Sequence, residues 1–452
     1  MVAQAPAPAV RTPARPVRWT RPATWPREVL ALAAYWIASR ALMVGLIRSG
    51  RTEPAIEVHR LYQGWYRVLR TGTFPVDDVT WQYPPGAALP MLAPGLLPFL
   101  SYLQAFVLLV LVADAAVQVA LLAAGRGPGR SDWGAWAWAL ALPLLLGLPY
   151  GRYDLPATAL AVGALLLVPA RPGAAGVLAG VGALVKVWPA LTLLGTPRGR
   201  TTRQAWTAAA VSALALLLVF AAFFDHAFDF LHAQRGRGVE IESLGGSALQ
   251  VARQFGWSGR VEQHYGSLEF LGRYVHRVAQ LSLLLTAAAF AWLLLWRVRA
   301  RRWTAATPYD AALSAVLLFT VTSRVISPQY LVWLIGLAAV CLTVEGTTQR
   351  PVAFLLLPAV GVTTIDYPLF FDAMQAGGWW PTAVILARNG LLLAAAGWSA
   401  ARLWRATVSP LPAPRPAANA SDAPDPTDAT DATDATDATD DPRTDPDAVP
   451  AA

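Results

Sequence analysis

Lysine is almost absent from this chain of 452 residues, because its 36 basic side chains are one lysine, Lys186, and otherwise arginines. Cysteine is equally scarce: Cys341 stands alone in an apolar run, which excludes a disulfide framework. Charged residues make up only 14% of the chain, hydrophobic residues make up 55%, and the mean hydropathy is +0.42. With several apolar runs of about 20 residues, this composition excludes a soluble globule and indicates a polytopic membrane protein.

The two ends of the chain lack the apolar pattern. Residues 409–452 hold ten Asp against two Arg, many prolines and a DATDATDATDAT repeat, so this segment cannot bury a core. The N-terminus is rich in Pro and Arg and has no cleavage-site pattern, so we interpret the first apolar run as a retained anchor. We predict a disordered cytoplasmic arm (1–27), a transmembrane domain (28–405) and a disordered, acidic cytoplasmic tail (406–452).

The arginines predict the topology of the transmembrane domain. Ten apolar runs are candidate spans: 28–47, 101–124, 134–149, 156–170, 205–224, 274–296, 309–325, 329–345, 351–366 and 383–401. Cytoplasmic loops carry an excess of basic residues. The short arginine clusters are 11–27, 126–130, 198–203, 297–302, Arg350, and 402–405. Ten spans that start inside place every cluster in the cytoplasm, return both termini there, and leave long outer loops at 48–86 and 225–273.

Two apolar stretches, 84–100 and 174–195, do not fit as ordinary spans. Arg171 and Arg198 both favour the cytoplasm, so the second stretch must enter the membrane and return. Trp188-Pro189 interrupts a helix there, because proline lacks an amide donor and restricts the residue before it. We therefore predict two short half-helices that form a hairpin, with Lys186 near its tip.

A charged lysine at that depth in the membrane is energetically unfavourable. A cation at mid-bilayer costs roughly 2.5–3.5 kcal/mol on insertion scales, and irregular backbone at membrane depth is tolerated where it lines a cavity or is buried in protein. We expect Lys186 to point into a polar cavity. The alternatives are a lysine that reaches an interface or one that pairs with a structural partner.

The acidic residues indicate which face of the membrane carries the chemistry. Several lie beside arginines at the boundaries of apolar runs, as in 152–154 and 237–242, and most fall outside on the predicted topology. The stretch EVHRLYQGWYRVLR (57–70) predicts an amphipathic helix at the outer membrane surface, whose simpler role is anchoring. We expect the working surface to face outward.

Five stretches together resemble glycosyltransferase family 87, a membrane family of the GT-C superfamily. They are EVHRLYQGWYRVLRTGTFPVDDVTWQYPPG (57–86), GRYDLPATAL (151–160), GALVKVWPAL (182–191), RGRGVEIES (235–243) and SPQYLVWL (327–334). The resemblance implies an all-α GT-C-like bundle in the cell membrane of a bacterium. It also implies an enzyme that transfers mannose or arabinofuranose, with inversion, from a polyprenyl-phosphate donor to an envelope glycolipid or polysaccharide. Membrane lipid is an expected partner, nucleic acid is not, and no cofactor or metal is implied.

The resemblance also suggests roles for individual residues. The family's base is usually an acidic residue, most often Asp, early in the first outer loop, and the matching position here is Glu57; Asp77 and Asp78 are the alternatives. Cations must stabilise the departing lipid phosphate, and the candidates are Lys186, Arg152, Arg237 and Arg324. For sugar or acceptor contacts the candidates are Tyr83, Asp154, Glu242, Gln329 and Tyr330. For each of these residues, an ion pair or contact that only fixes a loop is the competing interpretation.

Two other classes of protein remain open from the residues alone. A transporter or flippase of a lipid-linked sugar would also use half-helices and charges within the membrane, although no internal repeat is visible and the charges gather on one face. A non-catalytic scaffold is the third class, and it would not need Lys186 at membrane depth.

Overall fold

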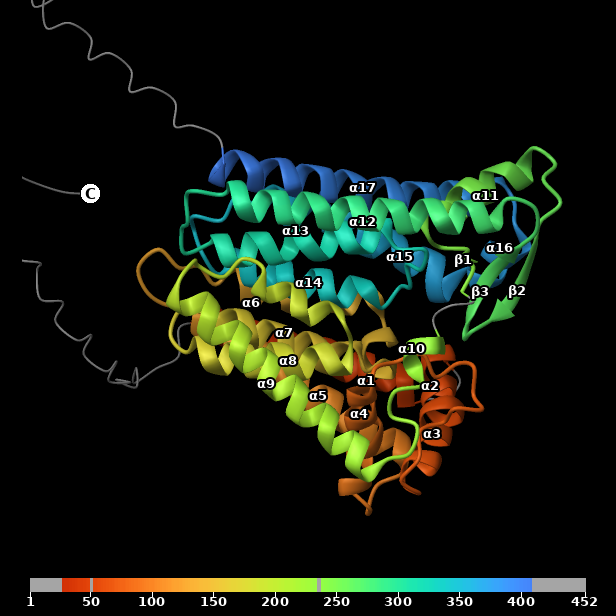
Figure 1. Ribbon diagram of the computed structural model, residues 1–452, viewed down its shortest axis with the longest axis horizontal. Helices are drawn as coiled ribbons and strands as arrows, with labels where there is room; N and C mark the ends of the chain where they lie inside the picture. Colours follow the sequence, from red (N-terminus) through yellow and green to blue (C-terminus); the bar gives the residue numbers. More distant parts are fainter. Residues whose placement is uncertain (1–26, 49–51, 234–236, 409–452) are drawn as a thin grey trace, which may run out of the picture. The chain divides into compact units, whose positions relative to one another are not determined.

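The computed structural model describes residues 27–48, 52–233 and 237–408. The predicted N-terminal arm and acidic tail lie almost entirely outside these residues, so the domain boundaries stay a prediction. The described part is overwhelmingly helical (Figure 1). The helices of its first half are α1 (Arg27–Arg48), α2 (Glu53–Glu57), α3 (Gln63–Leu69), α4 (Ala88–Leu92), α5 (Tyr102–Ala124), α6 (Trp133–Ala141), α7 (Asp154–Leu167), α8 (Pro172–Val185) and α9 (Arg200–Phe223).

The second half adds further helices and a small sheet. The helices are α10 (Phe230–Ala233), α11 (Leu244–Gln254), α12 (Val275–Arg299), α13 (Thr307–Thr322), α14 (Tyr330–Leu342), α15 (Arg350–Thr364), α16 (Phe371–Ala376) and α17 (Trp379–Thr407). The strands β1 (Val239–Glu240), β2 (Arg260–His264) and β3 (Ser267–Leu271) form an antiparallel sheet in the order β1-β3-β2. In Figure 1 this sheet, α11 and α16 lie together at one end of the long helices α12 and α17.

Six helical segments of the described part are long and apolar enough to cross a membrane: α1, α5, α9, α12, Arg350–Leu369 and α17. Four more apolar helices are shorter: Trp133–Leu145, α7, α8 and α14. The chain is therefore an all-α membrane protein, as the composition predicted. Many large side chains of α9 and α12 are exposed, including Leu218 (58%) and Leu284 (67%), as expected of helices that face lipid. By contrast, α14 is buried along nearly its whole length, which is why its sequence is apolar on every side.

Several predicted spans differ from the structure in length. A spanning helix needs roughly 17–25 residues, yet α7 has 14, α13 has 16 and α14 has 13. These helices begin or end next to polar segments, around Arg152 and around 323–329, that turn inward to line a cavity. The helix is interrupted because those residues need irregular backbone to present polar groups at this depth.

The predicted hairpin is present. Helix α8 ends at Val185, and a 3-10 turn, Trp188–Leu193, runs back along it, so that a Cβ on Gly182 would lie 2.9 Å from Pro189. Lys186 lies at the tip, in extended backbone. Gly176 and Gly180 let α9 approach α8 closely, because a Cβ at either position would overlap the carbonyl oxygen of Ala205 or Ala209. The hairpin is thereby held between α7 and α9.

Candidate active site

A cavity of about 460 Å³ lies where the segments between the helices converge. Its walls come from the end of α2, residues 80–84, the α8 hairpin, the strand segment 237–242, the β2–β3 turn and the loop 323–330. The charged residues among its lining are Glu57, Arg152, Lys186, Arg237, Glu240, Glu242 and Arg324. Elements from most of the length of the chain therefore contribute polar groups to one site.

Lys186 lies at the wall of this cavity and also has a carboxylate partner. Its Nζ is 2.6 Å from Oδ1 of Asp154, which is 1% exposed and also accepts a hydrogen bond of 2.7 Å from the Trp333 indole. The ammonium lies 4.6 Å from the ring centroid of Tyr153 and 5.1 Å from that of Trp333. Such cation–π contacts help a cation to stay charged away from water. The predicted cavity and the competing structural partner are thus both present.

Glu57 forms an ion pair with Arg152 across the cavity. Glu57 ends α2 and is followed by one π-helical turn, Val58–Tyr62, before α3 continues the helix. Single π turns within helices often occur at functional sites because they reorient nearby side chains. The Glu57 side chain is 25% exposed and that of Arg152 is 10% exposed, so the carboxylate remains reachable from the cavity.

Arg237 and Arg324 occupy the wall formed by the strand segment and the loop before α14. Arg237 Nε lies 3.4 Å from Oε1 of Glu269, and Nη1 of Arg324 donates to the Arg237 carbonyl oxygen at 2.9 Å. Glu269 pairs with Arg237 behind this wall, and both arginine side chains also border the cavity, where an anion would be attracted to their two positive charges.

Glu240 and Glu242 lie on the same wall but serve different partners. Glu240 accepts hydrogen bonds from the Ile326 amide at 2.6 Å and the Ser327 hydroxyl at 3.1 Å, which fixes the loop before α14. Burial raises the pKa of Glu240, and the charge of Arg237 opposes that rise. Glu242 lies 2.8 Å from Nη1 of Arg388, and burial raises its pKa well above the usual range, helped by the nearby Asp366 charge.

Several buried donors beside the cavity have no hydrogen-bond partner among the described residues. They are Nε of Arg152, the hydroxyl of Tyr153 and the indole N–H of Trp188. An unsatisfied buried donor costs about 1–3 kcal/mol. Arg152 and Trp188 line the cavity and Tyr153 does not, so two of these donors belong to side chains that a polar ligand in the cavity would contact.

The comparisons with known proteins now bear on this geometry. The family model of glycosyltransferase family 87 matches residues 81–328, which is more than half of the chain. The chain belongs to glycosyltransferase family 87. It is therefore a membrane glycosyltransferase, and the transporter and scaffold interpretations lose their support. Comparisons with curated proteins and with solved structures find no match.

Most of the predicted site residues of this glycosyltransferase meet at the cavity. Those that line it are Glu57, Tyr83, Arg152, Lys186, Arg237, Glu242, Arg324, Gln329 and Tyr330. Asp154 lies directly behind Lys186. Burial raises the pKa of the Tyr83 phenol to about 12, so that this side chain meets a ligand as a neutral hydroxyl.

Asp77 and Asp78 do not reach this cavity. Asp78 accepts hydrogen bonds from the Trp65 indole at 2.8 Å and the Thr80 hydroxyl at 2.5 Å, which fixes the loop between α3 and the cavity. Asp77 lies in a separate, open pocket beside Val68 and Thr73. Between the three candidate bases, only Glu57 borders the cavity that holds the cations.

The sequence analysis missed Arg388, which holds Glu242 in place. Arg388 is fully buried in α17 and lies 2.8 Å from Glu242 and 2.9 Å from Asp366. It was overlooked because it lies inside a run treated as a uniform span, 383–401. An arginine within an apolar run is rare enough that it should itself have indicated a buried partner.

The described residues hold no cluster of three or more His, Cys, Asp or Glu side chains in a metal-binding arrangement.

Proposed function

We propose that this glycosyltransferase transfers mannose or arabinofuranose from a polyprenyl-phosphate donor to an envelope glycolipid or polysaccharide, with inversion at the anomeric carbon. The observation that carries the proposal is the cavity in which one reachable carboxylate, Glu57, faces four cations. A transfer from a lipid phosphate needs a base for the acceptor and positive charge for the leaving group. Both are present at one site.

The donor phosphate would bind among Lys186, Arg152, Arg237 and Arg324. A polyprenyl-phosphate sugar is a phosphodiester with one negative charge, and its departing group gains a second. Cations fixed beforehand are therefore worth more in the transition state than in the ground state. The unpartnered Nε of Arg152 and indole N–H of Trp188 support this placement, since both are donors that a phosphate oxygen can satisfy.

Glu57 would act as the base. The acceptor hydroxyl oxygen attacks the anomeric carbon, the bond from that carbon to the phosphate oxygen breaks, and polyprenyl phosphate leaves with the electron pair. The hydroxyl proton passes to the Glu57 carboxylate. In the donor-free protein Arg152 is paired with Glu57, and a phosphate that draws on Arg152 would leave the carboxylate more basic. Donor binding would then precede activation of the acceptor.

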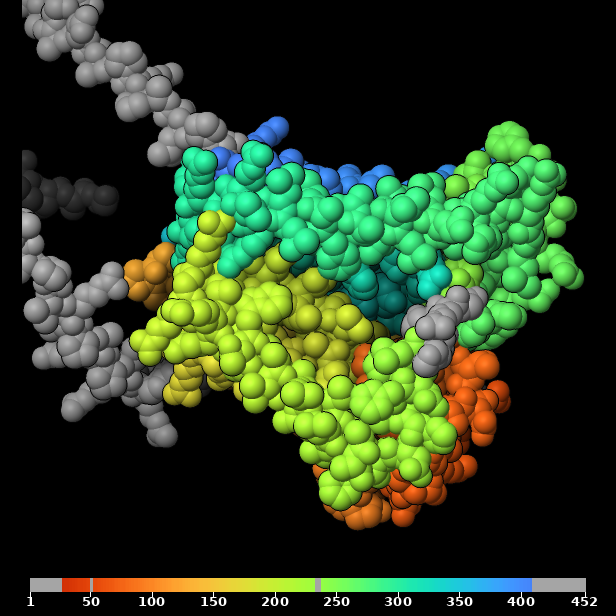
Figure 2. Space-filling model, viewed as in Figure 1, coloured from red at the N-terminus to blue at the C-terminus, as the bar shows by residue number. Residues whose placement is uncertain are grey.

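The membrane arrangement follows from the basic loops. We propose ten spans plus the α8 hairpin and the 84–100 segment, both termini in the cytoplasm, and the cavity on the outer face of a bacterial plasma membrane. Figure 2 shows the surface hollowed between α9 and α12. Both helices expose large apolar side chains such as Leu214 and Leu281, so the hollow between them suits a prenyl chain that reaches the cavity from the lipid.

The test is a transfer assay with purified protein in detergent or nanodiscs. Polyprenyl-phosphate mannose, polyprenyl-phosphate arabinofuranose and a nucleotide-sugar control are supplied with short alkyl glycosides, and products are identified by mass spectrometry and by anomeric configuration. We expect transfer from one of the lipid-linked donors and none from the nucleotide sugar. Turnover of only the nucleotide sugar, or retention at the anomeric carbon, would refute the proposal.

A further inference from the structure

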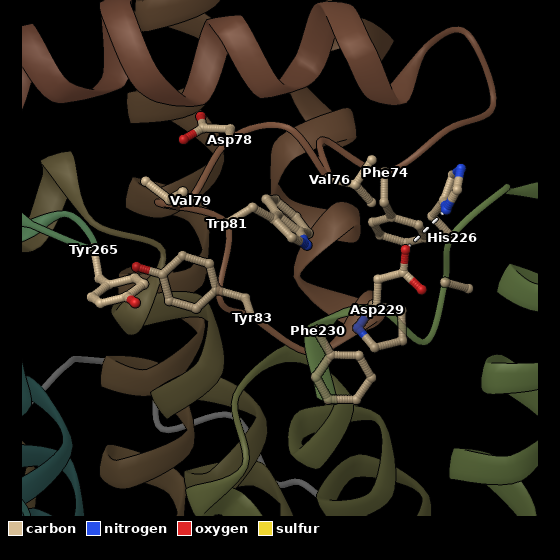
Figure 3. Close-up of a pocket in the computed structure, with 12 residues that line it drawn as sticks. Phe74, Val76, Asp78, Val79, Trp81, Tyr83, His226, Asp229, Phe230 and Tyr265 are labelled. Atoms are coloured by element: carbon tan, nitrogen blue, oxygen red, sulfur yellow. Dashed lines mark hydrogen bonds and ion pairs between the residues drawn. The ribbon is translucent and has the colours of Figure 1, made fainter. Parts of the chain in front are cut away.

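A second, smaller pocket opens beside the cavity, and Figure 3 shows its lining. Its volume is about 210 Å³. We define the aromatic pocket by Phe74, Trp81, Tyr83, Phe230 and Tyr265, the five rings that line it. Tyr83, Phe230 and Tyr265 also line the cavity, so the two spaces are neighbours that share these three side chains as a common wall.

The aromatic pocket combines ring faces with polar groups at its rim. In Figure 3 the Trp81 ring lies between Tyr83 on one side and the pair His226–Asp229 on the other. His226 Nδ1 is 2.9 Å from Oδ2 of Asp229, and both side chains are about half exposed. Asp78 also reaches the lining. Carboxylates at the rim disfavour a prenyl chain, because contact with the chain would strip water from the charges without replacing their hydrogen bonds.

A sugar ring matches this combination. One face of a pyranose or furanose presents C–H groups that pack on aromatic rings, while its edge presents hydroxyls that donate to carboxylates. The volume of the pocket is below the roughly 300–1,000 Å³ of pockets for drug-sized ligands. It therefore fits one sugar ring and not a long chain.

The backbone conformation differs in origin at two residues of the lining. Tyr265 has φ of 50° and Gly266 has φ of 75°, and they form the two-residue turn between β2 and β3, which requires positive φ at both positions. His226 has φ of 66° in the loop after α9. Non-glycine residues held in this left-handed conformation gather at binding and catalytic sites, so His226 is the residue whose backbone points to a functional pocket.

We propose that the aromatic pocket binds a sugar ring of the acceptor that lies next to the sugar whose hydroxyl reacts. The acceptor is therefore a glycan of at least two sugars, and neither a lipid alcohol nor a lone monosaccharide fills the site. The identity of this glycan as acceptor rests on the proposed function, whereas glycan binding by the pocket can be measured without any transfer.

The experiment measures binding of free oligosaccharides to the full-length protein in detergent without donor. The probes are a mannose disaccharide, an arabinofuranose disaccharide and the two monosaccharides, and Kd is obtained by saturation-transfer NMR titration. Wild-type protein should bind one disaccharide more tightly than its monosaccharide. Tyr265→Asn, which suits the left-handed backbone, should weaken that binding roughly tenfold through loss of the ring. Asp229→Asn should weaken it about threefold or more through loss of a charged acceptor.

Two matched controls share the chemistry of these variants but lie outside the pocket lining. Phe228→Leu removes an exposed ring from the same loop, and Glu262→Gln neutralises an exposed carboxylate on β2. Both should keep the wild-type Kd. Equal affinity for mono- and disaccharides, or identical Kd values for all four variants, would overturn the inference while leaving transfer from polyprenyl phosphate intact. Weakened binding in both pocket variants, in a protein that transfers no sugar from lipid donors, would instead refute the proposed function and retain the glycan site.

Discussion

Arg40 and Lys186 both carry positive charge into apolar helical segments, but the protein surrounds them differently. Arg40, in α1, is 2% exposed and donates to both carboxylate oxygens of Asp114, to the Ser39 hydroxyl and to the Ala139 carbonyl oxygen. Lys186 makes one hydrogen bond to a carboxylate, is 12% exposed and borders the cavity. The cost of burying Arg40 is met entirely within the protein. Lys186 keeps donor capacity that faces the cavity.

The Asp114 side chain completes the contrast. It accepts further hydrogen bonds from the Trp138 indole at 2.6 Å and the Tyr150 hydroxyl at 2.5 Å. A charge whose partners are provided by α1, α5, α6 and the 3-10 turn Leu148–Gly151 positions those elements and has few hydrogen-bonding groups left for a substrate. A structural cation uses its N–H groups on partners within the protein. A candidate binding residue keeps N–H groups that face a cavity. This difference separates the two more clearly than depth in the membrane or charge does.

The largest expected effect is on stability, at Arg40. Arg40→Met should lower the free energy of unfolding by about 3–5 kcal/mol, because Asp114 is left as an unpaired buried charge. Thermal unfolding in detergent would measure the loss. Arg40→Met with Asp114→Asn should recover most of it and bind donor as the parent does. A double variant that folds well but no longer binds donor would assign Arg40 to the donor site and refute its purely structural role.

The next effect is on rate, at Glu57. Glu57→Gln removes proton acceptance but keeps the shape of the side chain, so transfer should fall by about 10²–10⁴. Donor affinity should stay at least as high as in the parent, because Arg152 is no longer paired with a carboxylate. Single-turnover transfer and donor binding, measured side by side, would separate the two quantities. Asp78→Asn is the matched comparison, and it should lower stability through the Trp65 and Thr80 contacts and lower transfer far less than Glu57→Gln does, through the acceptor contact in the aromatic pocket. If Asp78→Asn abolishes transfer in folded protein while Glu57→Gln remains active, the base has been assigned wrongly.

A smaller effect concerns the lysine itself. Lys186→Met alone should lose folded protein, because Asp154 is 1% exposed and, among the residues that the structure describes, its carboxylate keeps only the Trp333 indole as a partner. Lys186→Met with Asp154→Asn removes both charges and should fold like the parent. It should bind polyprenyl-phosphate sugar about ten- to a hundredfold more weakly, because it loses one charge-assisted hydrogen bond to the donor phosphate. Normal donor affinity in this double variant would show that Lys186, like Arg40, stabilises the fold and does not bind the donor.

The smallest effect is a dependence on pH at Glu242, a carboxylate whose partners are buried. Burial raises its pKa well above the ordinary 4.5, so the folded protein binds a proton that the unfolded chain releases. This contribution to stability is complete below about pH 4.5 and is lost as pH rises through the raised pKa. Glu242→Gln should flatten the decline of thermal stability across that range, whereas the exposed control Glu262→Gln should not. Identical pH profiles of thermal stability for the parent, Glu242→Gln and Glu262→Gln would show that the pKa of Glu242 is not raised.

Much of the fold and part of the site could be predicted from local patterns. The apolar runs located the helices, because burial in lipid or protein requires continuous apolar sequence, although some helix ends differ by several residues, as at α6, which ends at Ala141 within the run 134–149. Trp188-Pro189 located the hairpin, because a proline interrupts helical hydrogen bonding wherever the helix lies. Arg388 and Arg40 were missed because their partners, Glu242 and Asp114, lie 146 and 74 residues away, and no local pattern pairs residues at that distance.

The sequence by itself determined that this is a polytopic membrane protein, that Lys186 lies at an interruption in an apolar segment, and which stretches carry the family resemblance. These properties depend on composition and on neighbouring residues. Only the tertiary structure decided that Arg152 pairs with Glu57 and Lys186 with Asp154, although only Tyr153 separates Arg152 from Asp154 in the sequence. It also separated Asp78 from the cavity and placed Tyr265 and Trp81 in the lining of the same pocket. Such choices depend on which helix ends meet, and that is settled by the packing of the whole bundle.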